Sequence, residues 1–216
     1  MSDLTLLEKI IIWAVPVVFA ITVHEVAHGW VAYRLGDATA KSSGRLTLNP
    51  LKHIDPVGTV VLPLILLYIG GFVFGWARPV PVSWQNLGHP RRDMALVAMA
   101  GPAANLIMML LWAILARTIL IFNPFPTGVL ELIMIMCSAG IIINIVLMVI
   151  NLIPLLPLDG GRIMNSLLPP RLAVVYARLE PFGLIIIVLL LASGLLSKYL
   201  SPVVFAIETF IYQLIG

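Results

Sequence analysis

Long apolar runs alternate along the chain with two shorter polar intervals, Gly36 to Asp55 and Ala77 to Asp93. The apolar segments extend over Leu6 to Leu35, Val57 to Trp76, Met94 to Phe122, Gly128 to Leu156, Phe182 to Leu196 and Val203 to Ile215. A helix needs about 20 apolar residues to cross the hydrocarbon layer of a bilayer. The pattern therefore predicts an all-α polytopic membrane protein with about four to five transmembrane helices.

Composition agrees with an integral membrane protein. Hydrophobic residues make up 61% of the chain and charged residues only 11%, whereas soluble domains have about 45–50% and about 25%. The net charge of +3 is scattered through apolar sequence, which argues against nucleic-acid binding. Cys137 is the single cysteine, so the chain forms no internal disulfide. Without repeats or long linkers, residues 1–216 are expected to form one domain, with a core over about 6–165 and helical segments over 181–216.

The distribution of basic residues predicts the topology, because such residues accumulate in short cytoplasmic loops. If Val57 to Trp76 crossed the bilayer, the basic residues would divide six against seven between its faces. If the segment enters and returns, the division is ten against three. Pro63 and Gly70-Gly71 also suit a re-entrant hairpin. We therefore expect the protein to lie in the cell membrane with its N-terminus on the outside. The segment after Ser201-Pro202 is left unassigned.

The first apolar segment contains His24-Glu25-Val26-Ala27-His28 in its inner half. Residues four apart on a helix project from one face about 5–6 Å apart, so both imidazoles can reach one zinc ion. Glu25 lies about 100° further round, where it can hold a metal-bound water. The alternative is a purely structural role, in which the two histidines form hydrogen bonds to neighbouring helices and Glu25 pairs with an arginine. Because polar groups at this depth are usually functional, the pattern favours a metal-activated hydrolase.

A catalytic zinc ion usually has three protein ligands, so a third must come from elsewhere in the chain. His53 and His89 lie in the polar intervals, where an exposed or capping histidine is commoner. Asp159 is a stronger candidate, because Pro154 and Pro157 break the third span just before it and Gly160-Gly161 allow close backbone contact. Its alternative role is to end a helix in an Asp-Gly turn.

Several motifs together resemble the site-2 protease family of intramembrane zinc metalloproteases. They are His24-Glu-Val-Ala-His28, Gly44-Arg-Leu-Thr-Leu-Asn-Pro50, Gly75-Trp-Ala-Arg-Pro-Val-Pro-Val82, Ala100-Gly-Pro-Ala-Ala-Asn105, Asn151-x-x-Pro154 and Leu158-Asp-Gly-Gly161. The resemblance implies one catalytic zinc ion held by His24, His28 and Asp159, with Glu25 as catalytic base. It also implies that Asn151 contacts the substrate, although from the sequence Asn151 equally suits a hydrogen bond to a neighbouring helix.

The family resemblance carries further expectations. Arg45 to Leu48 and Pro79 to Val82 are predicted to be short membrane-associated β-strands that bind a peptide, the second at an edge because Pro81 lacks an N–H group. No insert the size of a PDZ domain follows the first span, as in short bacterial or archaeal members. The implied activity is hydrolysis of a transmembrane or membrane-proximal substrate from the cytoplasmic side, through a water activated by zinc and Glu25.

Two other classes of function stay open from the sequence. A metal transporter would also place histidine and carboxylate in a span, but it needs a polar route that continues to the outer face. Above His24 the first segment is apolar back to Glu8-Lys9, apart from Thr22. An inactive membrane scaffold is the third class. Inactive relatives usually lose the catalytic base or a metal ligand. Here the base and the ligands are all present, namely His24, Glu25, His28 and Asp159.

Overall fold

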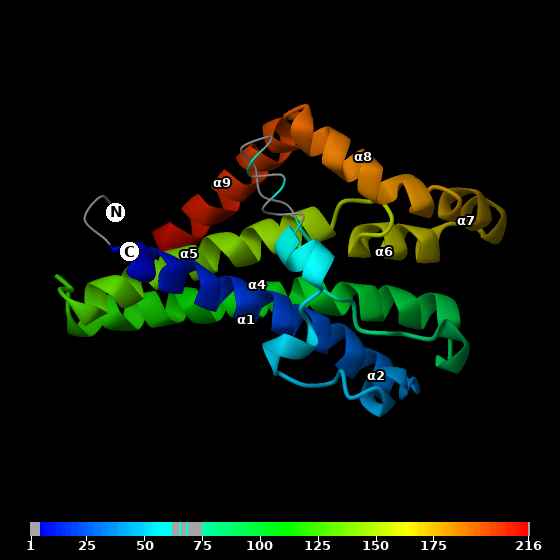
Figure 1. Cartoon of the computed structure of the whole chain (residues 1–216), viewed down its shortest axis with the longest axis horizontal. Coiled ribbons are helices and arrows are strands. Elements are labelled where there is room, and N and C mark those ends of the chain that lie inside the picture. Colours follow the sequence, from blue (N-terminus) through cyan, green and yellow to red (C-terminus); the bar gives the residue numbers. More distant parts are fainter. Residues whose placement is uncertain (1–4, 62–64, 66–67, 69–74, 216) are drawn as a thin grey trace.

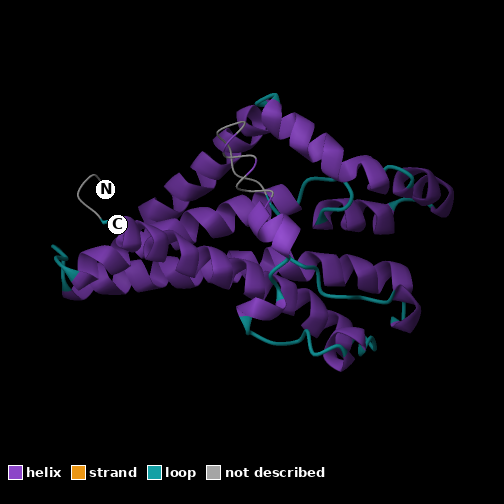
Figure 2. Ribbon diagram, viewed as in Figure 1, coloured by secondary structure: helices purple, strands orange, loops and turns teal. Residues whose placement is uncertain are grey.

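The computed structural model describes residues 5–61, 65, 68 and 75–215 (Figure 1). Regular structure within these residues is entirely helical, as Figure 2 shows. The helices are α1 (Leu6–Arg34), α2 (Thr39–Ser42), α4 (Pro90–Phe122), α5 (Val129–Asn151), α6 (Asp159–Leu167), α7 (Pro170–Ala177), α8 (Glu180–Ala192) and α9 (Leu195–Ile215), with the shorter turns η1 (Pro50–Lys52), η2 (Pro56–Val61) and η3 (Trp84–Asn86). The predicted all-α class is confirmed.

Among the residues that the structure describes, four helices, α1, α4, α5 and α9, are long and apolar enough to cross a membrane. A fifth span results if α7 and α8, which meet at 61°, are taken as one bent element. On α4 the large side chains of Ile107, Leu111 and Ile114 are about 60% exposed, whereas Ala113 and Ala116 on the opposite side are buried. A helix that is apolar on both its buried and its exposed side suits lipid rather than water. The chain is a multi-pass membrane protein.

Helix α1 begins with a capping box. The Thr5 hydroxyl accepts a hydrogen bond from the Glu8 N–H group at 3.3 Å, and the Glu8 carboxylate accepts one from the Thr5 N–H group at 2.8 Å. These bonds satisfy two N–H groups at the helix start that have no partner within the helix. The 29 residues of α1 extend for about 44 Å at about 1.5 Å per residue. The helix is therefore long enough to cross the bilayer and continue into the polar region, and His24 and His28 lie in its C-terminal half.

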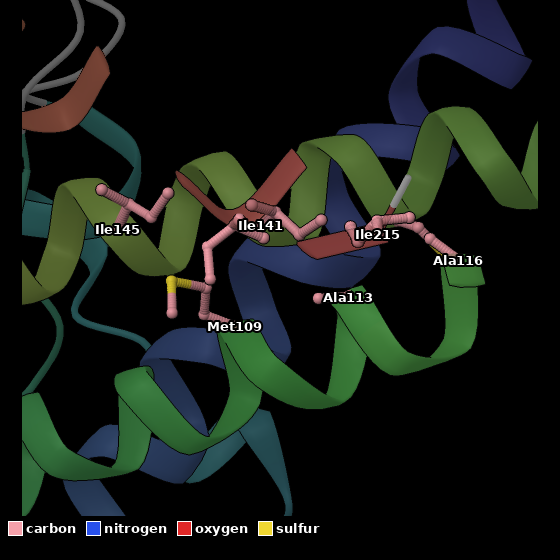
Figure 3. Packing of buried hydrophobic residues seen from close by; sticks show 8 residues of the cluster. Met109, Ala113, Ala116, Ile141, Ile145 and Ile215 are labelled. Atoms are coloured by element: carbon pink, nitrogen blue, oxygen red, sulfur yellow. The ribbon is translucent and has the colours of Figure 1, made fainter. Parts of the chain in front are cut away.

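Helices α1, α4 and α5 lie side by side, and α9 packs against α5 and α4 at the end of the bundle that holds both termini (Figure 1). The apolar core lies at this end, between α4, α5 and α9 (Figure 3). It consists of Met109, Ala113, Ala116, Cys137, Ile141, Ile145, Ile211 and Ile215. Cys137 is a fully buried packing residue. In addition, α4 packs against α1 and α6, and α5 packs against α1.

The predicted β-strands are wrong. Residues 45–48 and 79–82 have irregular backbone without strand pairing. The Arg45 guanidinium donates to the carbonyl of Arg78 at 2.7 Å, and the Val80 N–H group donates to the Glu25 carboxylate at 2.9 Å. Pro79 and Pro81 have no N–H group to give a ladder. The Arg45 side chain therefore makes the contact with the second segment, whose backbone is also bound by Glu25 of α1, in place of sheet pairing.

The predicted re-entrant segment, Val57 to Trp76, lies mostly outside the described residues. Its ends are described and meet, because Trp76 N donates to Gly58 O at 3.1 Å and the Thr59 hydroxyl donates to Trp76 O at 2.9 Å. Trp76 thus lies against η2, so the two ends of the segment are close together. The hairpin between these ends stays a prediction.

The C-terminal helices differ from the expected division. The predicted span Phe182 to Leu196 is not one helix, because α8 ends at Ala192 after 13 residues and Gly194 adopts φ +72° before α9 begins. The segment after Ser201-Pro202, to which the sequence assigns no structure, belongs to α9, since Pro202 lies within that helix. A helix can retain proline when its neighbours satisfy the freed backbone groups. The element long enough to span is therefore α9, over residues 195–215.

Candidate metal centre

Helix α1 presents His24 and His28 one turn apart on the same face. Their Nε2 atoms lie 3.0 Å apart, with ring centroids 4.6 Å apart and planes inclined at 84°. His24 is 7% exposed. This face of α1 packs against α4, so both imidazoles are directed into the helix bundle. The regular geometry of a helix accounts for the pairing that the sequence predicted.

Asp159 reaches the same point from α6. After α5 ends at Asn151, residues 152–158 form a tight turn, and Asp159 opens the next helix. A Cβ atom at Gly160 would lie 2.2 Å from the Leu152 carbonyl oxygen, so only glycine lets α6 approach the turn this closely. Asp159 Oδ2 lies 3.2 Å from His24 Nε2, and Oδ1 lies 3.3 Å from His28 Nε2. The unwound helix end therefore places a carboxylate beside the two imidazoles.

The chemistry of the three groups fits a divalent cation. His24 Nδ1 faces the Asn105 side-chain oxygen at 2.6 Å, and His28 Nδ1 faces the Val97 carbonyl at 2.7 Å. Both partners accept hydrogen bonds, so each imidazole carries its proton on Nδ1 and has a free lone pair on Nε2. Asp159 Oδ2 is buried, and no hydrogen-bond donor faces it from the described part of the chain. Three acceptors thus converge within 4.8 Å of one another, as ligands of one metal ion would.

Gly101 on α4 forms the wall opposite these ligands. A Cβ atom there would lie 2.4 Å from His28 Nε2 and 2.5 Å from His24 Nε2. The absent side chain of Gly101 therefore leaves space beside the ligand atoms. The motif around Gly101 serves the metal centre as well as the packing.

Sequence reasoning missed Asn144. Its side-chain oxygen accepts a hydrogen bond from the Asn105 amide at 2.9 Å, and its own amide donates to the Gly140 carbonyl at 2.8 Å. Asn105 and Asn144 are fully buried. Asn105 thus forms hydrogen bonds across helices to both α1 and α5. The available signal for Asn144 was a lone amide within the apolar run of α5, a setting in which polar residues are uncommon.

Glu25 lies next to the ligands under the segment that precedes α4. Its Oε2 atom accepts the Val80 N–H group at 2.9 Å. Gly29, one turn further along α1, lets this segment approach, because a Cβ atom there would lie 2.9 Å from the Val80 side chain. The half-buried carboxylate is thus held at the boundary between α1 and the polar interval.

The other candidates lie apart from this cluster. His53 is buried and its Nε2 bonds to the Thr47 carbonyl at 2.9 Å, whereas His89 is exposed directly before α4. Neither belongs to the group of potential metal ligands in the described part of the chain. The Asn151 amide donates to Leu147 O of its own helix at 2.9 Å, not to a neighbouring helix. Its contact with substrate stays a prediction.

The chain is similar to curated bacterial proteins over most of its length. It is 41% identical over 193 residues to a Bacillus subtilis protein named "Putative zinc metalloprotease YwhC", covering 87% of this chain and 83% of that protein. It is 30% identical over 191 residues to a Mycolicibacterium smegmatis protein named "Putative zinc metalloprotease Rip2", and 28% identical over 190 residues to Rip2 of Mycobacterium tuberculosis strain H37Rv. Each Rip2 match covers 86% of this chain and 68% of the relative.

No family model and no solved structure matches the chain. The assignment therefore depends on the curated relatives, of which YwhC is similar over more than four fifths of both sequences. Their shared description as zinc metalloproteases agrees with the converging histidines and carboxylate, and it identifies zinc as the cofactor. The chain belongs to the site-2 protease family of zinc metalloproteases.

Proposed function

We propose that the protein is an intramembrane protease that hydrolyses peptide bonds in transmembrane or membrane-proximal segments of other proteins. The observation that carries this proposal is the position of the potential ligands, since His24 and His28 belong to a membrane-spanning helix and Asp159 joins them from α6. A soluble substrate has no access to such a site through lipid. A substrate within the bilayer can approach it laterally.

His24, His28 and Asp159 are the proposed zinc ligands. When bound there, zinc lowers the pKa of a water molecule towards about 7 and polarises a peptide carbonyl. The chain would supply two imidazole nitrogens with free lone pairs and one carboxylate, so zinc bound there with the usual four ligands would keep one position for water. Gly101 keeps that space free of protein atoms.

Glu25 is the proposed general base. It follows His24 directly, so it lies beside the ligands without joining them. The carboxylate accepts a proton from the attacking water and then donates it to the amine nitrogen as the peptide C–N bond breaks. The Val80 N–H group, 2.9 Å from Oε2, orients the carboxylate and leaves Oε1 for the proton.

The proposed orientation places the site towards the cytoplasm of a cell membrane. Arg34, Arg91 and Arg162 lie at the end of the bundle that carries α2, α6 and the two polar intervals (Figure 1). Basic residues of this kind remain on the cytoplasmic side during insertion. Water for hydrolysis would then enter from the cytoplasm, along the irregular backbone around residues 152–158.

The deciding experiment compares wild-type protein with Glu25→Gln on a model substrate that has one transmembrane segment. We expect Glu25→Gln to retain bound zinc and to cleave about 10²- to 10⁴-fold more slowly, the usual contribution of a general base. Glu131→Gln, a change in the first turn of α5 far from the ligands, is the matched control and should cleave at the wild-type rate. Equal cleavage by wild type and Glu25→Gln would disprove the role of Glu25, and a zinc-loaded wild type without cleavage would disprove proteolysis.

A further inference from the structure

A chain of hydrogen bonds crosses three helices and ends at one metal ligand. From the Gly140 carbonyl on α5 it passes to the Asn144 amide at 2.8 Å, from Asn144 to Asn105 on α4 at 2.9 Å, and from Asn105 to His24 Nδ1 on α1 at 2.6 Å. Asn105 and Asn144 have no exposed surface, and His24 is 7% exposed. No water competes for these bonds in such a site, so their geometry persists.

The direction of every bond follows from the first. A backbone carbonyl can only accept, so Asn144 must turn its NH2 group to Gly140 and its oxygen to Asn105. Asn105 must then offer its NH2 group to Asn144 and its oxygen to His24. An oxygen facing Nδ1 requires a proton on Nδ1, which leaves the lone pair on Nε2. Nε2 is the atom that faces His28 and Asp159.

We infer that Asn105 and Asn144 are positioning residues that hold His24 in the tautomer and orientation needed for zinc binding. This inference rests on the proposed zinc ligands. Asn105 acts on His24 directly, and Asn144 acts through Asn105 because it fixes which way the Asn105 amide points. His28 needs no such pair, since its Nδ1 bonds to the backbone carbonyl of Val97. Only one of the two histidines therefore depends on side chains of other helices.

The alternative is that the two amides merely join α4 to α5. Two substitutions of Asn105 separate these roles. Asn105→Asp keeps an oxygen opposite His24 Nδ1, so the bond to the histidine is preserved. Its second oxygen faces the Asn144 oxygen, so the bond between α4 and α5 is lost. Asn105→Leu fills the same space and removes both contacts. If Asn105 positions His24, Asn105→Asp should bind zinc more tightly than Asn105→Leu. If Asn105 only packs the helices, the two variants should bind zinc equally.

The test is a zinc titration of the full chain in detergent, with a competing chelator, alongside thermal unfolding to show that each variant is folded. We expect Asn105→Leu and Asn144→Leu each to weaken zinc binding by about 10- to 100-fold, the usual effect of removing a partner of a metal ligand. The double variant should bind no more weakly than Asn105→Leu alone, because Asn144 reaches His24 only through Asn105. Asn105→Asp should bind more tightly than Asn105→Leu.

Ser138→Ala is the matched control, because Ser138 lies on α5 and its hydroxyl bonds only to Met134 O of the same helix, at 3.3 Å. It should bind zinc as wild type does. Wild-type affinity in folded Asn105→Leu and Asn144→Leu, additive losses in the double variant, or equal affinities of Asn105→Asp and Asn105→Leu would overturn the inference. If Asn105→Leu does not fold, the zinc affinities of Asn144→Leu and Asn105→Asp are compared with that of wild type instead, and Asn144→Leu should bind zinc more weakly than wild type.

The titration also separates this inference from the proposed protease activity. Wild-type protein that binds zinc but cleaves no substrate would disprove the proteolysis and leave the role of the asparagines intact. Active wild-type protein whose asparagine variants bind zinc normally would disprove the positioning role alone. Wild-type protein without zinc affinity would disprove both.

Discussion

At the scale of residues, the candidate metal centre depends as much on a missing side chain as on those present. His24, His28 and Asp159 converge on a space bounded by Gly101, and a Cβ atom at Gly101 would come within 2.5 Å of both imidazoles. Real Cβ atoms do not approach other atoms this closely, so one methyl group must displace the rings. The two imidazoles are held at Nδ1 by Asn105 and Val97, which limits how far they can move.

Gly101→Ala tests this restriction. Overpacking in a well-packed interior costs about 1–3 kcal/mol, so we expect zinc affinity to fall by about 5- to 150-fold. Cleavage should fall with it and recover in part at higher zinc concentration. Ala100→Ser adds one atom to the neighbouring residue of α4 and should leave zinc binding unchanged. Unaltered zinc affinity in folded Gly101→Ala would show that the ligands do not use this space.

At the scale of elements, the polar interval before α4 is held over α1 by side chains of the other interval. Asp37 is fully buried and accepts hydrogen bonds from Thr39 N at 3.0 Å, Ser83 N at 2.7 Å and Asn86 Nδ2 at 2.9 Å. Burial raises the pKa of Asp37, but the hydrogen bonds from Thr39, Asn86 and Ser83 outweigh this and hold the pKa below its ordinary value. The ionised Asp37 side chain thus joins the first polar interval to the second. It thereby keeps Val80, which belongs to the second interval, in contact with Glu25.

Asp37→Asn should loosen this segment. Hydrogen bonds to a charged group contribute about 1.5–3 kcal/mol, so amide hydrogen exchange over residues 80–86 should become about 10- to 150-fold faster. Because the pKa of Asp37 is lowered by folding, its contribution is complete above the unfolded-state pKa of about 4 and is lost as the pH falls through the folded-state value. In wild-type protein, amide exchange over residues 80–86 should therefore become faster in the same way only in strong acid. The measured rates are first corrected for the pH dependence of intrinsic exchange.

Asp55→Asn is the control for this experiment. Asp55 accepts hydrogen bonds from Val57 N at 3.1 Å and Gly58 N at 2.7 Å, both within its own turn. Its substitution should leave exchange over residues 80–86 unchanged. Equal effects of the two substitutions would mean that Asp37 has no special part in holding the segment.

The elements that the sequence predicted correctly are those determined by local periodicity. His24 and His28 share a face because helix geometry repeats over each turn, and the break before Asp159 follows from Pro154 and Pro157. The strands at 45–48 and 79–82 failed because a strand needs a partner, and here Arg45 and Glu25 take up the backbone groups instead. Asn144 was missed because its partner Asn105 is 39 residues away in the sequence. Contacts of this kind depend on how the helices pack, which no local pattern records.

At the scale of the whole molecule, the bundle has two unlike ends. Both termini and the connection from α4 to α5 lie at one end, and the polar intervals with α6 and α7 lie at the other (Figure 1). The apolar core occupies the first end and the candidate metal centre lies towards the second. A site displaced towards one membrane face has a short route to water on that side and a long apolar barrier on the other. This asymmetry suits a hydrolase better than a transporter, which needs polar access to both sides.

The proposed orientation predicts which end faces the cytoplasm. Ser43, after α2, and Thr127, between α4 and α5, are exposed at opposite ends, and the native Cys137 is fully buried. In intact bacterial spheroplasts, a membrane-impermeant thiol reagent should label Thr127→Cys at once and Ser43→Cys only after permeabilisation. The reverse pattern would place the metal centre towards the outside, and water and substrate would then have to reach Glu25 from that face. Labelling of both variants in sealed spheroplasts would show that the two ends share a side, which is incompatible with α1, α4 and α5 crossing the bilayer as a bundle.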